Sequence, residues 1–200
     1  MNNCYEQYFA ENINYLKDAL ESVNGDEMTA LIDAGERTIR SGHKIIASGL
    51  GKNVPICDKF VGSMLSMGME AGFLHTNSAV HGDLGMVRQG DMVIILTKSG
   101  STVESVYLAD ILRKRQDVQV WLLCGKRHSP LSDALENKVI YSLEHEGDLW
   151  NILPNNSTTV NLIILQTLAM ELAKRLGITL EDFKSNHPGG AIGETLRWKN

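Results

Sequence analysis

The chain has 200 residues, a formal net charge of −5, and a composition of 43% hydrophobic and 22% charged residues. This size suits one globular domain with a buried core, and the negative charge argues against nucleic acid as a partner. No apolar run is long enough to span a membrane and the N-terminal residues lack a signal-peptide pattern, so we expect a cytoplasmic protein with no membrane partner.

Two helices are expected at the start of the chain. An apolar stripe over residues 15–23 predicts the first, which Asn24-Gly25 ends, and the second is expected over 28–40. Short apolar runs then alternate with helical patterns. Five of these runs are predicted strands: residues 44–48, 71–75, 91–96, 118–124 and 138–143. A helix through 60–67 follows the first strand, and a long helix over 157–176 ends at Gly177, a common C-cap residue.

Strands that alternate with helices indicate an α/β fold in three layers, with a five-stranded parallel sheet flanked by helices on both faces. We expect a single domain over residues 1–200, with flanking helices over 1–42 and the α/β core over 43–200. Ligands of such sheets bind at the carboxyl ends of the strands. The helix over 157–176 is apolar nearly all round, which is typical of a core helix or a subunit interface, so we expect a homo-oligomer.

The cysteines indicate a reducing compartment. Cys4, Cys57 and Cys124 are odd in number, far apart and without a C-x-x-C pair. We therefore expect reduced, mostly buried thiols.

The polar turn after the third predicted strand is the first candidate for a ligand site. Its sequence, TKSGST over 97–102, combines four hydroxyl side chains with Gly100 at the start of a helix. A helix N-terminus offers free N–H groups and a positive dipole end, glycine allows close approach, and hydroxyls add donors, so a phosphate monoester would fit. Ser101 and Glu104 also match a capping box, so phosphate binding and plain helix capping both stay open.

The turn resembles the phosphate loop of the sugar isomerase (SIS) fold. Four further stretches, in the same order, resemble the SIS domain of arabinose 5-phosphate isomerases: GLGKN (49–53), HGDLGMV (81–87), LPNNSTT (153–159) and DFKSNHPGGAIG (182–193). The resemblance implies the three-layer SIS fold, a tetramer and no cofactor. It also implies that the chain interconverts D-ribulose 5-phosphate and D-arabinose 5-phosphate through an enediol, which supplies Kdo for lipopolysaccharide or capsule.

The chain departs from the family pattern at three points. Full-length members carry a pair of C-terminal CBS domains that this sequence does not contain, so it resembles a short single-domain form or a piece of a longer chain. The first loop usually reads G-K-S-G, where this chain has Asn53 after Lys52. The phosphate loop usually has Glu where this chain has Ser101.

An aldose–ketose isomerase needs a base, an acid at the carbonyl oxygen and groups that open the sugar ring. The resemblance assigns four candidate catalytic residues by motif: Lys52, Glu104, Glu146 and His187. Lys52 is expected to stabilise phosphate or the enediolate. Only the family pattern selects Glu146, as a proton-transfer base, from the neighbouring acids. A histidine titrates near neutrality and suits proton transfer, and we hypothesise that His187 acts across a subunit interface.

Seven residues are candidate substrate contacts: Gly68, Met69, His81, Thr97, Ser99, Ser101 and Thr102. The four hydroxyls belong to the phosphate loop. His81 is expected to contact a sugar hydroxyl or to open the ring, while Gly68 and Met69 are expected to line the pocket through their backbone. A structural or inhibitory divalent ion at His75 stays open, and a required metal is not expected.

Two other functions fit parts of the sequence. An isomerase for another phosphosugar, such as a phosphoheptose or hexulose 6-phosphate isomerase, would share the phosphate loop but not the combination of HGDLG with SNHPGG. A non-catalytic sugar-phosphate sensor would be expected to carry a helix-turn-helix segment and a basic face, and the sequence shows neither. Feedback binding of a nucleotide sugar would be compatible with catalysis.

Overall fold

The structure is a computed structural model, and it describes residues 4–197. Its centre is a sheet of five parallel strands in the order β2-β1-β3-β4-β5. The strands are β1 (Ile45–Gly49), β2 (Ala71–His75), β3 (Met92–Thr97), β4 (Gln119–Cys124) and β5 (Lys138–Ile140). The α-helices are α1 (Cys4–Glu21), α2 (Gly25–Arg40), α3 (Val54–Ser66), α4 (Thr76–Ala79), α5 (Val103–Leu112), α6 (Pro130–Ala134), α7 (Asn156–Leu176), α8 (Leu180–Ser185) and α9 (Gly190–Arg197). Two short 3₁₀ helices, η1 (Gly51–Asn53) and η2 (Asp83–Met86), follow β1 and precede β3.

All five predicted strands are present, so the predicted α/β class and parallel sheet are confirmed. The central strands β1 and β3 are buried along their whole length, which accounts for the unbroken apolar runs that predicted them. The fifth strand is shorter than predicted, because it ends at Ile140 rather than Leu143. The N–H of Ser142 donates to Oγ of Ser22 at 2.7 Å, so the chain has already left the sheet there.

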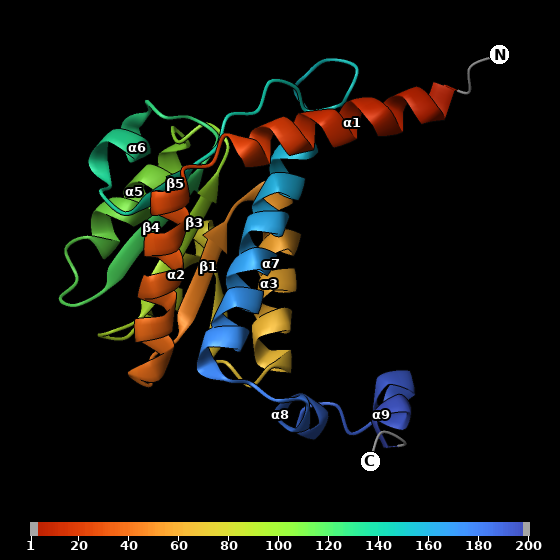
Figure 1. Cartoon of the computed structure of the whole chain (residues 1–200). Helices are drawn as coiled ribbons and strands as arrows, with labels where there is room; N and C mark the ends of the chain where they lie inside the picture. Colours follow the sequence, from red (N-terminus) through yellow and green to blue (C-terminus); the bar gives the residue numbers. More distant parts are fainter. Residues whose placement is uncertain (1–3, 198–200) are drawn as a thin grey trace.

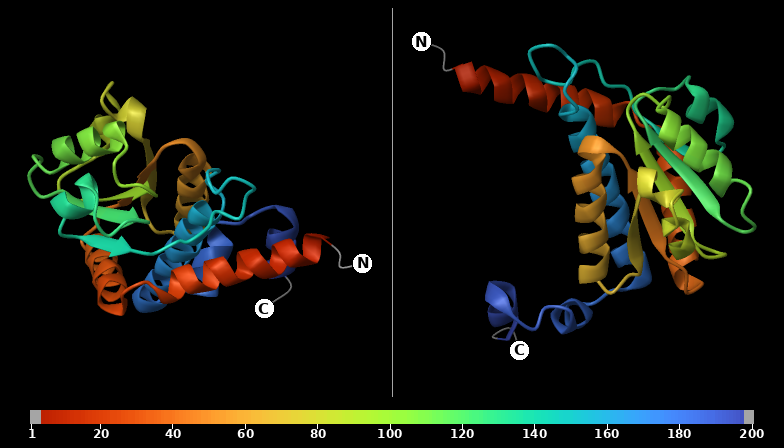
Figure 2. Two further views of the ribbon diagram at one scale, coloured as in Figure 1. Left: turned by 90° about the horizontal axis from the view of Figure 1, so that it is seen from above. Right: turned by 180° about the vertical axis from the view of Figure 1, so that it is seen from behind.

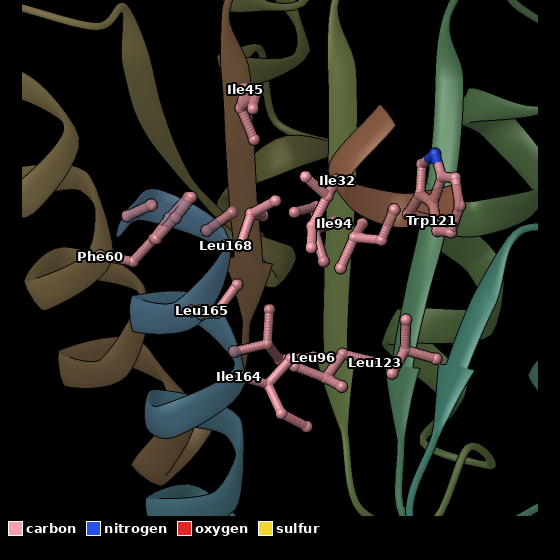
Figure 3. Close-up of a cluster of buried hydrophobic side chains, with 14 of the residues drawn as sticks. Ile32, Ile45, Phe60, Ile94, Leu96, Trp121, Leu123, Ile164, Leu165 and Leu168 are labelled. Carbon is pink, nitrogen blue, oxygen red and sulfur yellow. The ribbon is translucent and has the colours of Figure 1, made fainter. Parts of the chain in front are cut away.

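Helices cover both faces of the sheet (Figure 1). α2, α3 and α7 pack on one face, and α4, α5 and α6 on the other. Figure 3 shows part of the first core layer, in which Phe60 of α3 and Leu165 and Leu168 of α7 lie against Ile45 and Ile94 of the central strands. Because alternate strand residues point to opposite faces, packing on both faces fixes the position of each central strand. It thereby also fixes the edge of the sheet at which the strands end.

Local capping sets where the helices begin and end. Asn24 is the N-cap of α2, since its Oδ1 accepts the N–H groups of Asp26 at 2.8 Å and Glu27 at 3.2 Å. α2 therefore begins at Gly25, three residues before the predicted start. α7 ends as predicted at Gly177, which has the left-handed φ of 70° that a C-cap glycine adopts.

α1 and the C-terminal helices extend from opposite ends of the molecule. α1 crosses the first turns of α7, whereas α8 and α9 lie beyond its last turn (Figures 1 and 2). Large apolar side chains are exposed on α1 and on the loop beside it, among them Phe9, Ile13, Leu149 and Trp150. Exposed apolar surface of this extent is typical of an interface. Among the helices of residues 4–197, none combines the length and apolar character needed to cross a membrane.

Candidate functional site

A cavity lies where the turns after β1 and β3 meet the loop before α7. Its volume is about 180 Å³, and its walls include Lys52, Thr97, Ser99, Thr102 and Ser157. β2 pairs with β1 on one side, and the chain then crosses over to β3, which pairs with β1 on its other side. The cavity therefore lies at the topological switch point, where ligands of open α/β sheets bind.

The turn over residues 97–102 has a fixed backbone. Oγ1 of Thr97 accepts the N–H of Gly100 at 3.1 Å, and Oγ of Ser99 accepts the N–H of Ser101 at 3.3 Å. Gly100 has a φ of 66°, and a Cβ there would collide with Oγ of Ser129. A glycine is required at this position both for the left-handed backbone and for the close approach of the next turn.

The first turn of α5 has no side-chain cap. Thr102 is the N-cap residue, and its side chain accepts no hydrogen bond from the N–H groups that follow. The predicted capping box of Ser101 and Glu104 is therefore wrong, because the helix begins one residue later than that box requires. Among the described residues, no side chain caps the start of α5 beside the cavity, which suits an anion.

Lys52 brings an exposed cation to the same cavity. It lies in η1, and none of the ion pairs within residues 4–197 involves it. The turn is held by Asn53, whose Oδ1 accepts a hydrogen bond from Nδ2 of Asn161 on α7 at 2.9 Å. Asn53 also packs so closely on Gly49 that a Cβ added to Gly49 would lie 2.8 Å from that of Asn53. These contacts fix the turn that carries the lysine.

Glu146 lies behind the cavity wall and is fully buried. Its Oε2 accepts the N–H groups of Asn155 and Ser157, each at 2.9 Å, and thereby caps α7. Its Oε1 lies 2.6 Å from Nζ of Lys98. Burial by itself would raise the pKa of the Glu146 carboxyl, but the bond from Lys98 and the two backbone N–H groups outweigh it, and the pKa lies below its ordinary value of 4.5. Glu146 is therefore a bound carboxylate at neutral pH.

Lys98 is a cavity residue that sequence reasoning missed. It lies within the predicted phosphate loop, it lines the cavity, and its side chain is 35% exposed. A lysine in a polar turn is usually a solvated surface residue, and nothing in the local sequence connects it with Glu146, 48 positions away. The one available signal was its place inside the loop.

A second hollow, of about 330 Å³, contains two other predicted residues. His81 and Glu104 line it together with Tyr107, on the other side of the first turns of α5. His75 ends β2 close by, and its Nδ1 is buried with no hydrogen-bond partner among the described residues. Across residues 4–197, no three or more His, Cys, Asp or Glu side chains are grouped as metal ligands.

Three predicted residues lie at the opposite edge of the sheet. Gly68 and Met69 connect the end of α3 to the start of β2, and Met69 is buried in the core. His187 follows α8, where its ring stacks on Phe183 with the centroids 4.0 Å apart. α3 has 13 residues and runs from the Lys52 turn to this edge, where Nδ2 of Asn186 donates to the carbonyl of Ser66, so about 20 Å separates the edge from the cavity. Within one chain these residues cannot line the cavity.

Both cysteines whose side chains are described are free and buried, as predicted for Cys57 and Cys124. Burial raises the pKa of Cys57 to about 12, and it also raises the pKa of Cys124. Both thiols are therefore protonated at neutral pH.

The family is decided by a match to the SIS domain, which covers residues 38–171. The chain belongs to the SIS domain family. The phosphate-loop turn, Lys52 and Glu146 all lie inside the matched part of the SIS domain.

Two curated relatives and one solved structure are similar to this SIS domain. The arabinose 5-phosphate isomerase KdsD of Pseudomonas aeruginosa is 34% identical over 183 residues, which are 92% of this chain and 56% of the relative. The arabinose 5-phosphate isomerase GutQ of Salmonella typhi is 37% identical over 155 residues, which are 76% of this chain and 47% of the relative. The chain thus spans about half the length of these relatives.

The solved structure is c3406 of Escherichia coli CFT073 in complex with arabinose 5-phosphate. It is 27% identical, its TM-score is 0.85, and the match covers 94% of this chain and 100% of that chain. The resemblance inferred from the phosphate loop and the four other stretches is therefore confirmed at the level of the family and the fold.

Proposed function

We propose that the chain is an aldose–ketose isomerase that interconverts D-ribulose 5-phosphate and D-arabinose 5-phosphate. The observation that carries this proposal is the 34% identity to a named arabinose 5-phosphate isomerase over 92% of the chain. The arabinose 5-phosphate bound by a protein of the same fold supports the same substrate class. The reaction needs no cofactor in this proposal.

The cavity at the switch point is the proposed phosphate site. Thr97, Ser99 and Thr102 line it with hydroxyl groups around the start of α5, and Lys52 adds a cation. Ser101 belongs to the same turn but is not among the residues that line the cavity. A phosphate dianion is stabilised by this combination of donors and positive charge. Holding the phosphate there would place the carbonyl end of the sugar toward the neighbouring acids.

Proton transfer is the remaining requirement. We propose Glu104 and His187 as the groups that move protons between C1 and C2 through the enediol, with Lys52 stabilising the enediolate, and Glu146 as a residue that supports the site from behind the cavity wall. His81 lines the same hollow as Glu104 and is the proposed contact for a sugar hydroxyl. Both oxygens of Glu146 are engaged in the structure, so Glu104 and His187 are the more accessible groups.

A complete site requires more than one copy of the chain in this proposal. His187, Gly68 and Met69 lie about 20 Å from the phosphate loop of their own chain, at the far end of α3. We propose a homo-oligomer, a tetramer as in the family pattern, in which this edge of one subunit meets the cavity of another. The exposed apolar side chains of α1 and its neighbouring loop support such contacts.

The wider role follows from the product. We propose that arabinose 5-phosphate made by this protein supplies Kdo for lipopolysaccharide or capsule, and that the reaction takes place in the cytoplasm.

The test is proton NMR of the purified protein with D-ribulose 5-phosphate in deuterated water and EDTA. Arabinose 5-phosphate that carries deuterium at C2 is the expected product, because the enediol exchanges its proton with solvent. Conversion in EDTA would also show that no divalent metal is required. Binding without conversion, measured by calorimetry, would favour a sugar-phosphate sensor. If ribulose 5-phosphate is neither bound nor converted, the substrate is another phosphosugar.

Thr102 separates phosphate binding from helix capping. Because its side chain caps nothing, Thr102→Ala is expected to change the melting temperature by less than about 2 °C. The loss of one hydroxyl donor to phosphate is expected to raise KM by about 10-fold, with kcat much less affected. Steady-state kinetics and a melting curve check both parts. An unchanged KM with a lowered melting temperature would mean that the hydroxyl serves the helix alone.

A further inference from the structure

Lys98 is fixed at both ends of its side chain. Its stem packs against Gly125, where an added Cβ would lie 3.4 Å from Cγ of Lys98 and 3.0 Å from its carbonyl oxygen. Its ammonium lies 2.6 Å from Oε1 of Glu146. The close approach of the Lys98 carbonyl therefore depends on a glycine in the turn after β4, and the charged end of the side chain is held by a buried carboxylate.

Glu146 has no free path to the cavity. The carboxylate has no exposed surface, and its second oxygen is occupied by the N–H groups of Asn155 and Ser157. Lys98, which contacts this carboxylate, lines the cavity, whereas Glu146 is not among the residues that line it. A ligand in the cavity would therefore meet the ammonium of Lys98 before it could meet Glu146.

The ammonium of Lys98 retains donors for a ligand. A lysine has three N–H donors, and one contact to Glu146 leaves two. These two donors belong to the same loop as the hydroxyls of Thr97 and Ser99, which line the cavity with Lys98. A dianionic phosphate in this cavity would thus lie among the hydroxyls, Lys52 and Lys98.

We propose that Lys98 is a second cationic contact for the phosphate of the substrate, and that Glu146 is a positioning residue that acts through Lys98. The proposal rests on the proposed function only in taking the substrate to be a phosphosugar. It places Glu146 one contact away from the substrate, with the ammonium of Lys98 between them.

The first test is calorimetric titration with inorganic phosphate, which needs no turnover. Lys98→Gln removes the charge and keeps an N–H donor for the buried carboxylate, so the fold is expected to persist. We expect this variant to raise the Kd for phosphate at least 10-fold, and Lys98→Arg to recover part of the loss. Lys126→Gln is the matched control, because Lys126 is an exposed lysine in the turn after β4, outside the cavity. An unchanged Kd in Lys98→Gln would overturn the proposal.

The second test is a double-mutant cycle between Lys98→Gln and Glu146→Gln, measured on kcat/KM and on the Kd for phosphate. If Glu146 acts through Lys98, Glu146→Gln changes both quantities in the parent and changes neither in the Lys98→Gln background. An equal effect in both backgrounds would show that Glu146 acts on the substrate directly, and would overturn its assignment. Near-ultraviolet circular dichroism establishes that each variant is folded.

The two proposals can fail separately. If the parent does not isomerise ribulose 5-phosphate but Lys98→Gln loses phosphate binding, the proposed phosphate contact stands and the proposed reaction fails. If Lys98→Gln isomerises ribulose 5-phosphate normally, the proposed phosphate contact fails and the proposed reaction stands.

Discussion

Lys52→Ala is expected to lower kcat/KM for ribulose 5-phosphate by about 10²- to 10³-fold, in line with the loss of one preorganised electrostatic contact to developing charge. Lys52 is exposed at the cavity and has no ion-pair partner among the described residues, so its charge is available to a ligand. Its turn is held independently of it by Asn53 and Asn161. The melting temperature is therefore expected to stay within about 2 °C of the parent.

The control for Lys52→Ala is Lys59→Ala. Lys59 is also exposed, but it lies on α3 and donates to Ser63 one turn further on. It is expected to leave kcat/KM unchanged. A division of the effect between kcat and KM locates the role of Lys52: a change in KM alone indicates phosphate binding, and a change in kcat indicates the enediolate. Turnover close to that of the parent would contradict the assignment.

Two inactive variants, Lys52→Ala and His187→Ala, are expected to restore activity when they are mixed. Each alone is expected to lose at least about 10²-fold in kcat/KM, His187→Ala through the loss of a proton-transfer group. Because about 20 Å separates these residues within one chain, they can meet only between chains. After random exchange of subunits, about a quarter of the sites would combine both intact residues.

The control for this mixture is the chain that carries both substitutions. Mixing it with either single variant creates no site with both residues intact, so no activity is expected. Native mass spectrometry of isotope-labelled subunits establishes that exchange has occurred. Complete exchange without recovered activity would exclude a shared site and would leave His187 as a residue of the Phe183 stack.

The sequence was sufficient for the fold because the central strands are buried on both faces. Runs such as residues 92–96 contain no polar residue, and only a strand with helices on both sides needs that pattern. The ends of strands were predicted less well where contacts with distant residues decide them. β5 ends at Ile140 because Ser142 bonds to Ser22, more than a hundred residues earlier, and no local pattern indicates such a bond.

The site was only partly predictable for the same reason. The phosphate loop and Lys52 follow strands directly, so their position at one edge could be predicted from the order of the elements. The pairing of Lys98 with Glu146 depends on how the loop before α7 folds across the sheet. The distance between His187 and the loop depends on the lengths of α3 and α7, and a motif match gives no information about that distance.

The thiol beneath the phosphate loop makes opening of the loop observable without an introduced cysteine. Sγ of Cys124 lies against Gly100 and 3.7 Å from the carbonyl oxygen of Lys98, and burial keeps it protonated. A thiol reagent can reach this sulfur only when the loop lifts from the turn after β4, so the rate of labelling measures how often the loop opens. Ligands that occupy the cavity hold the loop closed in proportion to their affinity, and Cys57, buried under Gly49, provides an internal reference.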